Sequence, residues 1–149
     1  RNNSDLSLLL LDLDHFKHVN DNHGHDVGDE VLKYVSATIS HRLRKTDLAC
    51  RLGGEEFGVL LPGASLDRAI CIAETIRKNI ADVPYARGDK LIALSVSIGV
   101  AEHGLDGRDL ESLYAIADGH LYRAKTSGRN RIRSRHVMRN GELDLALTD

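Results

Sequence analysis

The chain divides into short apolar runs and longer stretches in which apolar residues recur at helical spacing. Residues 7–13 form an apolar run that ends in acidic residues, which predicts a buried strand. Residues 15–25 are polar and rich in Asn, Asp, His and Gly, so we expect a loop or a broken helical turn there. Residues 26–44 carry apolar side chains at every fourth position, which predicts a helix with one buried face. Those positions are Val27, Val31, Val35, Ile39 and Leu43.

The centre of the chain predicts a hairpin followed by a second helix. Residues 48–52 and 57–61 are typical of short strands, and the turn between them contains Gly53 and Gly54. Ser65 is expected to cap a helix that extends to residue 80.

The remaining pattern predicts one strand over residues 91–100 and a helix over 109–127, closed by Gly128. Because a hairpin pairs its strands antiparallel, we expect an α+β fold in which helices flank a mixed or antiparallel central sheet. We expect one domain over residues 1–149, with a strand and then a flexible tail within 131–149.

Composition narrows the class of protein. The 149 residues are 42% hydrophobic and 28% charged, as in an ordinary globular domain. A formal net charge of −2 argues against a general nucleic-acid binder. The longest apolar run, residues 8–11, is too short to span a membrane, so we expect no membrane contact by this domain. Cys50 and Cys71 have apolar neighbours, so we expect them to be buried and reduced, as in a cytoplasmic protein.

Acidic residues close the first predicted strand. Asp12 and Asp14 would share one face if the strand continued through them. Two carboxylates at a buried strand end repel each other unless a cation compensates, and a hard divalent cation such as Mg²⁺ suits them. Taken alone, acids that simply end a strand and cap a turn are the more frequent explanation.

A second acidic pair follows the glycines of the hairpin. Adjacent glycines allow the backbone to approach a ligand closely, and the side chains of Glu55 and Glu56 would point to opposite sides of a regular strand. A simple turn with soluble residues explains this segment equally well. Two strands that each offer a carboxylate at one edge, however, are typical of a two-metal phosphoryl-transfer site.

Basic residues and histidines supply further candidates. Lys17, Lys125 and Arg129 could hold phosphates, although the last two also complement the dipole at a helix end. Four histidines lie within eleven residues, which suits either a zinc site or solvated and ligand-contacting side chains; no cysteine accompanies them, which favours the latter. These are His15, His18, His23 and His25.

These motifs together resemble the GGDEF family of diguanylate cyclases. Residues 51–57, Arg-Leu-Gly-Gly-Glu-Glu-Phe, are similar to the family signature in its GGEEF form. Residues 12–21 resemble the family's D-x-D-x-F-K-x-x-N-D segment, and 24–29 its G-H-x-x-G-D segment. The similarity continues through 97–100 and 117–130 in the family's order and spacing.

The resemblance implies a fold like the adenylyl cyclase catalytic domain and the polymerase palm. It implies condensation of two GTP molecules into cyclic di-GMP with release of two pyrophosphates, by a homodimer that uses Mg²⁺, or Mn²⁺ in its place. Two alternatives remain: a catalytically silent receptor domain for GTP or cyclic di-GMP, and an enzyme that makes another cyclic dinucleotide.

The resemblance also implies roles for individual residues. Asp12 and Glu55 would ligate the metal by side chain and Leu13 by its carbonyl, while Glu56 would complete the shell of a second metal. Glu55 is in addition the candidate base, so Glu55 and Glu56 are the expected catalytic residues. The expected substrate-binding residues are Phe16, Lys17, Asn20, His25, Asp29, Gly53, Gly54, Lys125 and Arg129.

Regulation and the N-terminus complete the comparison with the family pattern. Arg44 and Asp47 match the family's R-x-x-D inhibitory site for the product. Thr75 stands where the family often has a further arginine, so this site differs from the family pattern. The family usually opens with a helix and an L-T-G-L-x-N-R segment that is absent before the first strand here, so we expect an N-terminal part of the domain to be missing.

Overall fold

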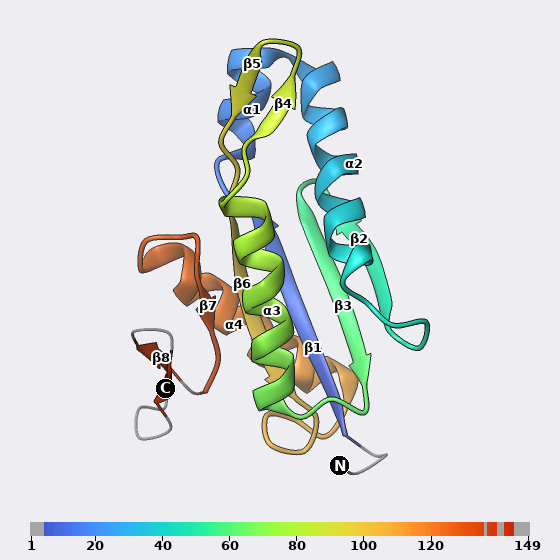
Figure 1. The fold of residues 1–149 in the computed structure, drawn as a ribbon. Coiled ribbons are helices and arrows are strands. Elements are labelled where there is room, and N and C mark those ends of the chain that lie inside the picture. Colours follow the sequence, from blue (N-terminus) through green and yellow to red (C-terminus); the bar gives the residue numbers. More distant parts are fainter. Residues whose placement is uncertain (1–4, 136, 140–141, 145–149) are drawn as a thin grey trace.

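A five-stranded mixed sheet forms the centre of the protein (Figure 1). The computed structural model describes residues 5–135, 137–139 and 142–144. The strand order is β2-β3-β1-β6-β7; all neighbours are antiparallel except β6 and β7, which are parallel. The expected mixed sheet is therefore confirmed. The strands are β1 (Leu6–Leu13), β2 (Leu48–Gly53), β3 (Glu56–Pro62), β6 (Val96–Glu102) and β7 (Ile132–Arg133).

Helices cover both faces of the sheet: α2 and α3 pack on one side and α4 on the other (Figure 1). Two small hairpins lie outside the central sheet. Among the described residues, no helix is long and apolar enough to cross a membrane. The helices are α1 (Phe16–His23), α2 (His25–His41), α3 (Leu66–Ala81) and α4 (Leu110–Thr126), and the hairpins are β4 (Tyr85–Arg87) with β5 (Lys90–Ile92) and β8 (Val137–Arg139) with β9 (Glu142–Asp144).

The side chains of β1 alternate between two apolar cores. Leu9 and Leu11 belong to the larger core with α2 and α3, whereas Leu8 and Leu10 belong to a smaller one beneath α4. This alternation follows from the two-residue period of a strand. It brings Asp12, the next residue of the Leu8 series, to the side that α4 covers.

A glycine sets the distance between α4 and the sheet. A Cβ atom on Gly99 of β6 would lie 2.1 Å from the carbonyl oxygen of Ala117 and 2.5 Å from the backbone nitrogen of Leu121. Only glycine therefore allows α4 to approach β6 this closely. This close approach places the last turn of α4 beside the end of β1.

Residues 15–25 are helical over most of their length, so the expectation of a loop or broken turn was wrong. Val19 is buried and Phe16 packs partly against the larger core, so a short apolar edge anchors an otherwise polar helix. Such a narrow edge gives little periodic signal in the sequence. Gly24, with φ of 92°, separates α1 from α2.

The single strand expected over residues 91–100 is divided. Residues 90–92 belong to the β4–β5 hairpin, and β6 starts only at Val96. The hairpin docks on α2 instead of extending the sheet: the ring of Tyr85 lies 4.9 Å from that of Tyr34, and Arg87 forms an ion pair with Glu30 at 3.1 Å. Contacts with α2 therefore determine the structure of the hairpin, which the local sequence pattern did not predict.

The expected burial of Cys50 and Cys71 was also wrong, since both are exposed free thiols. Cys50 lies on the edge strand β2, and Cys71 lies on the outer side of α3. Apolar sequence neighbours did not imply burial because successive residues point to different faces. The tail expected after residue 131 begins with β7, and parts of it (136, 140–141 and 145–149) lie outside the described residues.

Candidate active site

Three acidic residues meet where β1 ends beside the β2–β3 hairpin. Asp12 lies opposite Glu56 in the antiparallel register of β1 and β3. The backbone N–H of Leu13 donates to the carbonyl oxygen of Glu55 at 3.1 Å. Asp12 is only 6% exposed, and both glutamates are half-buried. The strand pairing therefore brings together the acids that the sequence placed on two separate strands.

Lys125 brings the only positive charge that contacts Asp12 among the described residues. Its ammonium group, on the last turn of α4, forms an ion pair with the Asp12 carboxylate. Burial raises the pKa of Asp12 above its ordinary value, Lys125 opposes this, and the charges of Glu55 and Glu56 raise the pKa further. Three acids with one close cation leave an excess of negative charge, which favours a further cation.

The acids do not form a closed ligand set. Within the part of the chain that the structure describes, no group of three or more His, Cys, Asp or Glu side chains converges closely enough to enclose a metal ion. This applies to the histidines of residues 15–25 as well; His15 and His18 stack with ring centroids 5.2 Å apart.

The hairpin turn depends on its two glycines. Gly53 and Gly54 have φ of 147° and 49°, values that side-chain-bearing residues rarely adopt. The register shifts between Arg51 and Gly53, and Arg51 Nε donates to the carbonyl oxygen of Gly54 at 2.8 Å. The turn thus presents exposed backbone next to Glu55.

Asp14 is a buried residue whose role the sequence did not reveal. It is 6% exposed and accepts three hydrogen bonds: from the hydroxyls of Ser95 and Ser97, each at 2.7 Å, and from the backbone N–H of Asn130 at 3.0 Å. It is therefore engaged by protein donors and does not pair with Asp12 on a metal. The alternation of Ser95 and Ser97 on one strand face was the available signal.

Asn20 and Gly28 define the contact between α1 and α2. A Cβ atom on Gly28 would lie 1.9 Å from Asn20 Oδ1, so the amide occupies the space that the glycine leaves free. That amide oxygen is buried and has no hydrogen-bond partner among the described residues. Asp29 and His25 are exposed on the adjoining part of α2. The contact between α1 and α2 therefore contains a buried, unpaired acceptor, and an exposed acid follows Gly28 on α2.

The remaining substrate candidates differ in position. Lys17 is 87% exposed and pairs with Asp21 of its own helix at 3.6 Å, so its ammonium group is not brought to the acids. Phe16 packs partly against the core, which leaves mainly its backbone for a ligand. Arg129 is exposed just beyond α4, with φ of 62°.

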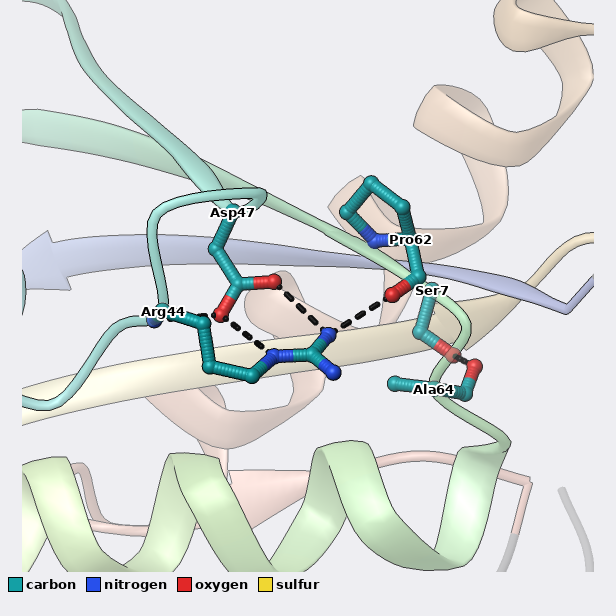
Figure 2. Close-up of polar contacts among 5 residues, drawn as sticks. All are labelled: Ser7, Arg44, Asp47, Pro62 and Ala64. Atoms are coloured by element: carbon teal, nitrogen blue, oxygen red, sulfur yellow. Dashed lines mark hydrogen bonds and ion pairs between the residues drawn. The ribbon is translucent and has the colours of Figure 1, made fainter. Parts of the chain in front are cut away.

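Arg44 and Asp47 bind each other at the opposite end of β3 from the glutamates (Figure 2). Arg44 Nη2 donates to Asp47 Oδ1 at 3.0 Å and to the carbonyl oxygen of Pro62 at 2.7 Å. The contact with Asp47 raises the pKa of Arg44. The Asp47 side chain is 1% exposed, while that of Arg44 is 47% exposed. Thr75 lies elsewhere, in a shallow pocket of about 190 Å³ that also contains Arg42 and Arg68.

Comparisons with known proteins agree with this geometry. The family described as "Diguanylate cyclase, GGDEF domain" matches residues 1–131. Diguanylate cyclase DgcM of Escherichia coli K12 is 49% identical over 129 residues, which cover 86% of this chain and 30% of that protein. The chain spans about a third of the length of the curated relatives it matches.

Solved structures give the same result. The GGDEF domain of YfiN (TpbB) from Pseudomonas aeruginosa aligns with a TM-score of 0.84 at 37% identity, covering 88% of this chain and 82% of that one. The GGDEF domain of DgcB from Caulobacter crescentus, solved in complex with c-di-GMP, aligns with a TM-score of 0.82 at 34% identity, covering 88% and 78%.

Proposed function

Since the chain belongs to the GGDEF family of diguanylate cyclases, we propose that it condenses two GTP molecules into one cyclic di-GMP and two pyrophosphates. The observation that carries this proposal is the meeting of Asp12, Glu55 and Glu56 at one sheet edge beside Lys125. In each half-reaction a 3′-hydroxyl attacks the α-phosphorus of the other GTP. The new P–O bond replaces the bond to pyrophosphate, and the hydroxyl proton passes to a base.

The donor set fits a hard divalent cation. Carboxylate and carbonyl oxygens are the ligands that Mg²⁺ and Mn²⁺ accept, and the excess of acids over bases favours such an ion. Asp12, Glu55 and Glu56 would hold it by side chain and Leu13 by its carbonyl. When bound, the ion neutralises triphosphate charge and activates the attacking hydroxyl.

The protein's own residues then bind, orient and deprotonate. Glu55 accepts the proton of the 3′-hydroxyl, because it is half-buried next to the hairpin turn where the ribose would lie. Gly53 and Gly54 allow the nucleotide to approach the backbone. Lys125 and Arg129 bind phosphate oxygens, with Lys125 exchanging the Asp12 carboxylate for the triphosphate. The backbone of Phe16 contacts the same group, and Lys17 reaches it by leaving its exposed pairing with Asp21.

Residues at the contact between α1 and α2 would select guanine. The unpaired amide oxygen of Asn20 accepts from a guanine N–H, and the Asp29 carboxylate accepts from the neighbouring donors. Adenine offers a different pattern of donors and acceptors at this edge. His25, the first residue of α2, adds a further contact.

Each chain carries one set of acids, so two chains would have to face each other for two GTP molecules to react. We therefore propose a homodimer as the active species, working in the cytoplasm where GTP is available. Arg44 and Asp47 would bind the product and slow the reaction. A relative solved with c-di-GMP supports the dinucleotide as a ligand of this fold.

The test is turnover of GTP by the purified chain with Mg²⁺, followed by mass spectrometry of the product. We expect cyclic di-GMP from the wild type and none from Glu55→Gln, which keeps the size of the side chain but cannot take the proton. GTP binding without product, at protein concentrations high enough to form dimers, would contradict the proposal and favour a receptor.

A further inference from the structure

The turn that follows α4 has an unusual backbone. Gly128, Arg129 and Asn130 have φ of 129°, 62° and 47°, so three successive residues lie in the left-handed region. Residues other than glycine seldom adopt this conformation, and they keep it only when their surroundings hold them. Arg129, a proposed phosphate ligand, lies in the middle of this turn.

Two side chains hold Asn130 in this turn, while Arg129 is held through its backbone: its N–H donates to the carbonyl oxygen of Ala124 and its carbonyl oxygen accepts from Arg131 Nε, each at 2.9 Å. The buried carboxylate of Asp14 accepts the backbone N–H of Asn130 at 3.0 Å. From the other side, Arg77 of α3 donates from Nη1 to its side-chain oxygen at 2.8 Å, while its remaining nitrogens bind Glu74. Asn130 is therefore fixed between the end of β1 and α3, and Arg129 is fixed with it.

Asp14 is itself rigidly placed. Its two oxygens accept from Ser95 and Ser97, and its backbone N–H donates to the carbonyl oxygen of Ser95 at 2.9 Å. A carboxylate that is 6% exposed and accepts three hydrogen bonds has no role as a direct ligand of solvent-borne phosphate. Its contacts instead connect three segments: the end of β1, the start of β6 and the turn after α4.

We propose that Asp14 is a positioning residue: by fixing Asn130 it sets the backbone position of Arg129, the proposed phosphate ligand. This inference rests on the proposed function. Asp12 and Asp14 are two residues apart, so one strand end carries the acid beside Glu55 and Glu56 and also anchors the turn that carries the arginine.

Loss of the Asp14 carboxylate should weaken GTP binding more than it slows the chemical step. Without the carboxylate, residues 129 and 130 can relax toward right-handed conformations, which moves Arg129 away from the triphosphate. A phosphate contact present in both the ground state and the transition state contributes uniform binding, so its loss raises KM and leaves kcat nearly unchanged.

The experiment compares Asp14→Ala with Asp14→Asn and with Asp106→Ala in the full chain. The amide of Asp14→Asn keeps one acceptor for Asn130 and can donate to a serine hydroxyl, so it should restore most of the function. Asp106 is a matched control: its side chain is 6% exposed and accepts the backbone N–H of Glu102 at 2.8 Å, at the other end of β6. Thermal unfolding verifies that each variant folds.

We expect Asp14→Ala to raise the KM for GTP about tenfold, with kcat within twofold, while Asp14→Asn and Asp106→Ala stay within threefold of the wild type. In the Asp14→Ala background, Arg129→Ala should add less than twofold, because the arginine is already displaced. Additive effects of the two changes, or an equal loss from Asp106→Ala, would overturn the proposal.

Two measurements separate this proposal from the proposed reaction. Calorimetric binding of a slowly reacting GTP analogue should weaken by the same factor in Asp14→Ala even if the wild type makes no product. Hydrogen exchange of the Asn130 amide should accelerate at least tenfold in Asp14→Ala and remain slow in Asp106→Ala. If Asp14→Ala does not fold, Ser97→Ala, which removes a hydroxyl donor to Asp14 and leaves the residues of the turn unchanged, should raise KM about threefold; an unchanged KM there would overturn the proposal.

Discussion

Gly28→Ala should separate ligand binding from folding. The added Cβ would lie 1.9 Å from Asn20 Oδ1, 3.0 Å from Asn20 Cγ and 3.3 Å from Phe16 Cζ. The amide oxygen must move by about 1.5 Å to reach ordinary van der Waals contact at 3.4 Å. Because the clashing atom is the end of a rotatable side chain, the helices can stay in place while the amide turns away.

The expected changes in stability and in GTP binding follow from this contrast between fixed helices and a movable Asn20 side chain. Alanine gains up to about 1 kcal/mol of helix propensity over glycine, which offsets the displacement of the Asn20 side chain. The free energy of unfolding should therefore change by less than about 1 kcal/mol. Loss of a buried hydrogen bond to guanine costs about 1–3 kcal/mol, which weakens GTP binding roughly 5- to 150-fold.

The assay is calorimetric titration with a slowly reacting GTP analogue, alongside thermal unfolding. Gly119→Ala is the matched control: it also lies in a helix, and beyond the backbone of that helix no described atom would lie within 4 Å of the added Cβ. It should raise the unfolding temperature and leave binding unchanged. A Gly28→Ala protein that binds the analogue as tightly as the wild type would refute the assignment of Asn20 to the guanine site.

Three further changes test other parts of the molecule. Gly99→Ala forces a Cβ against the backbone of α4 and should lower the free energy of unfolding by about 3 kcal/mol or more in urea titration, whereas Gly119→Ala should not. In EDTA, Asp12→Asn should unfold at a higher temperature than the wild type at pH 7: burial raises the pKa of Asp12, so its charged form costs stability, and the difference should disappear toward pH 3.8. Added Mg²⁺ should stabilise the wild type but not this variant. Arg44→Ala should keep the initial rate and abolish curvature of the progress curve caused by product; curvature equal to that of the wild type would remove Arg44 from the inhibitory site.

Periodicity predicted the elements whose side chains face one core. The valines of α2 lie where the sequence placed them, because burial on one face leaves a regular pattern, whereas β1 was predicted from a continuous apolar run because both of its faces are buried. Helix α1 was missed since Val19 and Phe16 are the only residues of this helix that join the larger apolar core among the described residues. The β4–β5 hairpin was missed since Arg87 and Tyr85 obtain their partners from α2, far away in the sequence.

The candidate site likewise contains contacts that the sequence could predict and contacts that it could not. Asp12, Glu55 and Glu56 could be brought together from strand alternation and a hairpin turn. The bond between Asp14 and Asn130 joins residues 116 positions apart, and no local pattern predicts it. Likewise, the pairing of Lys17 with Asp21 depends on the helix that the sequence did not predict.

The most direct test of the central claim is the product formed from an equal mixture of GTP and ATP with Mg²⁺. The purified chain at high concentration should yield cyclic di-GMP alone, with two pyrophosphates released per product and no product from Glu55→Ala. A mixed or adenine-containing cyclic dinucleotide would contradict the proposed guanine site. GTP binding without any cyclic product would contradict the proposed catalysis.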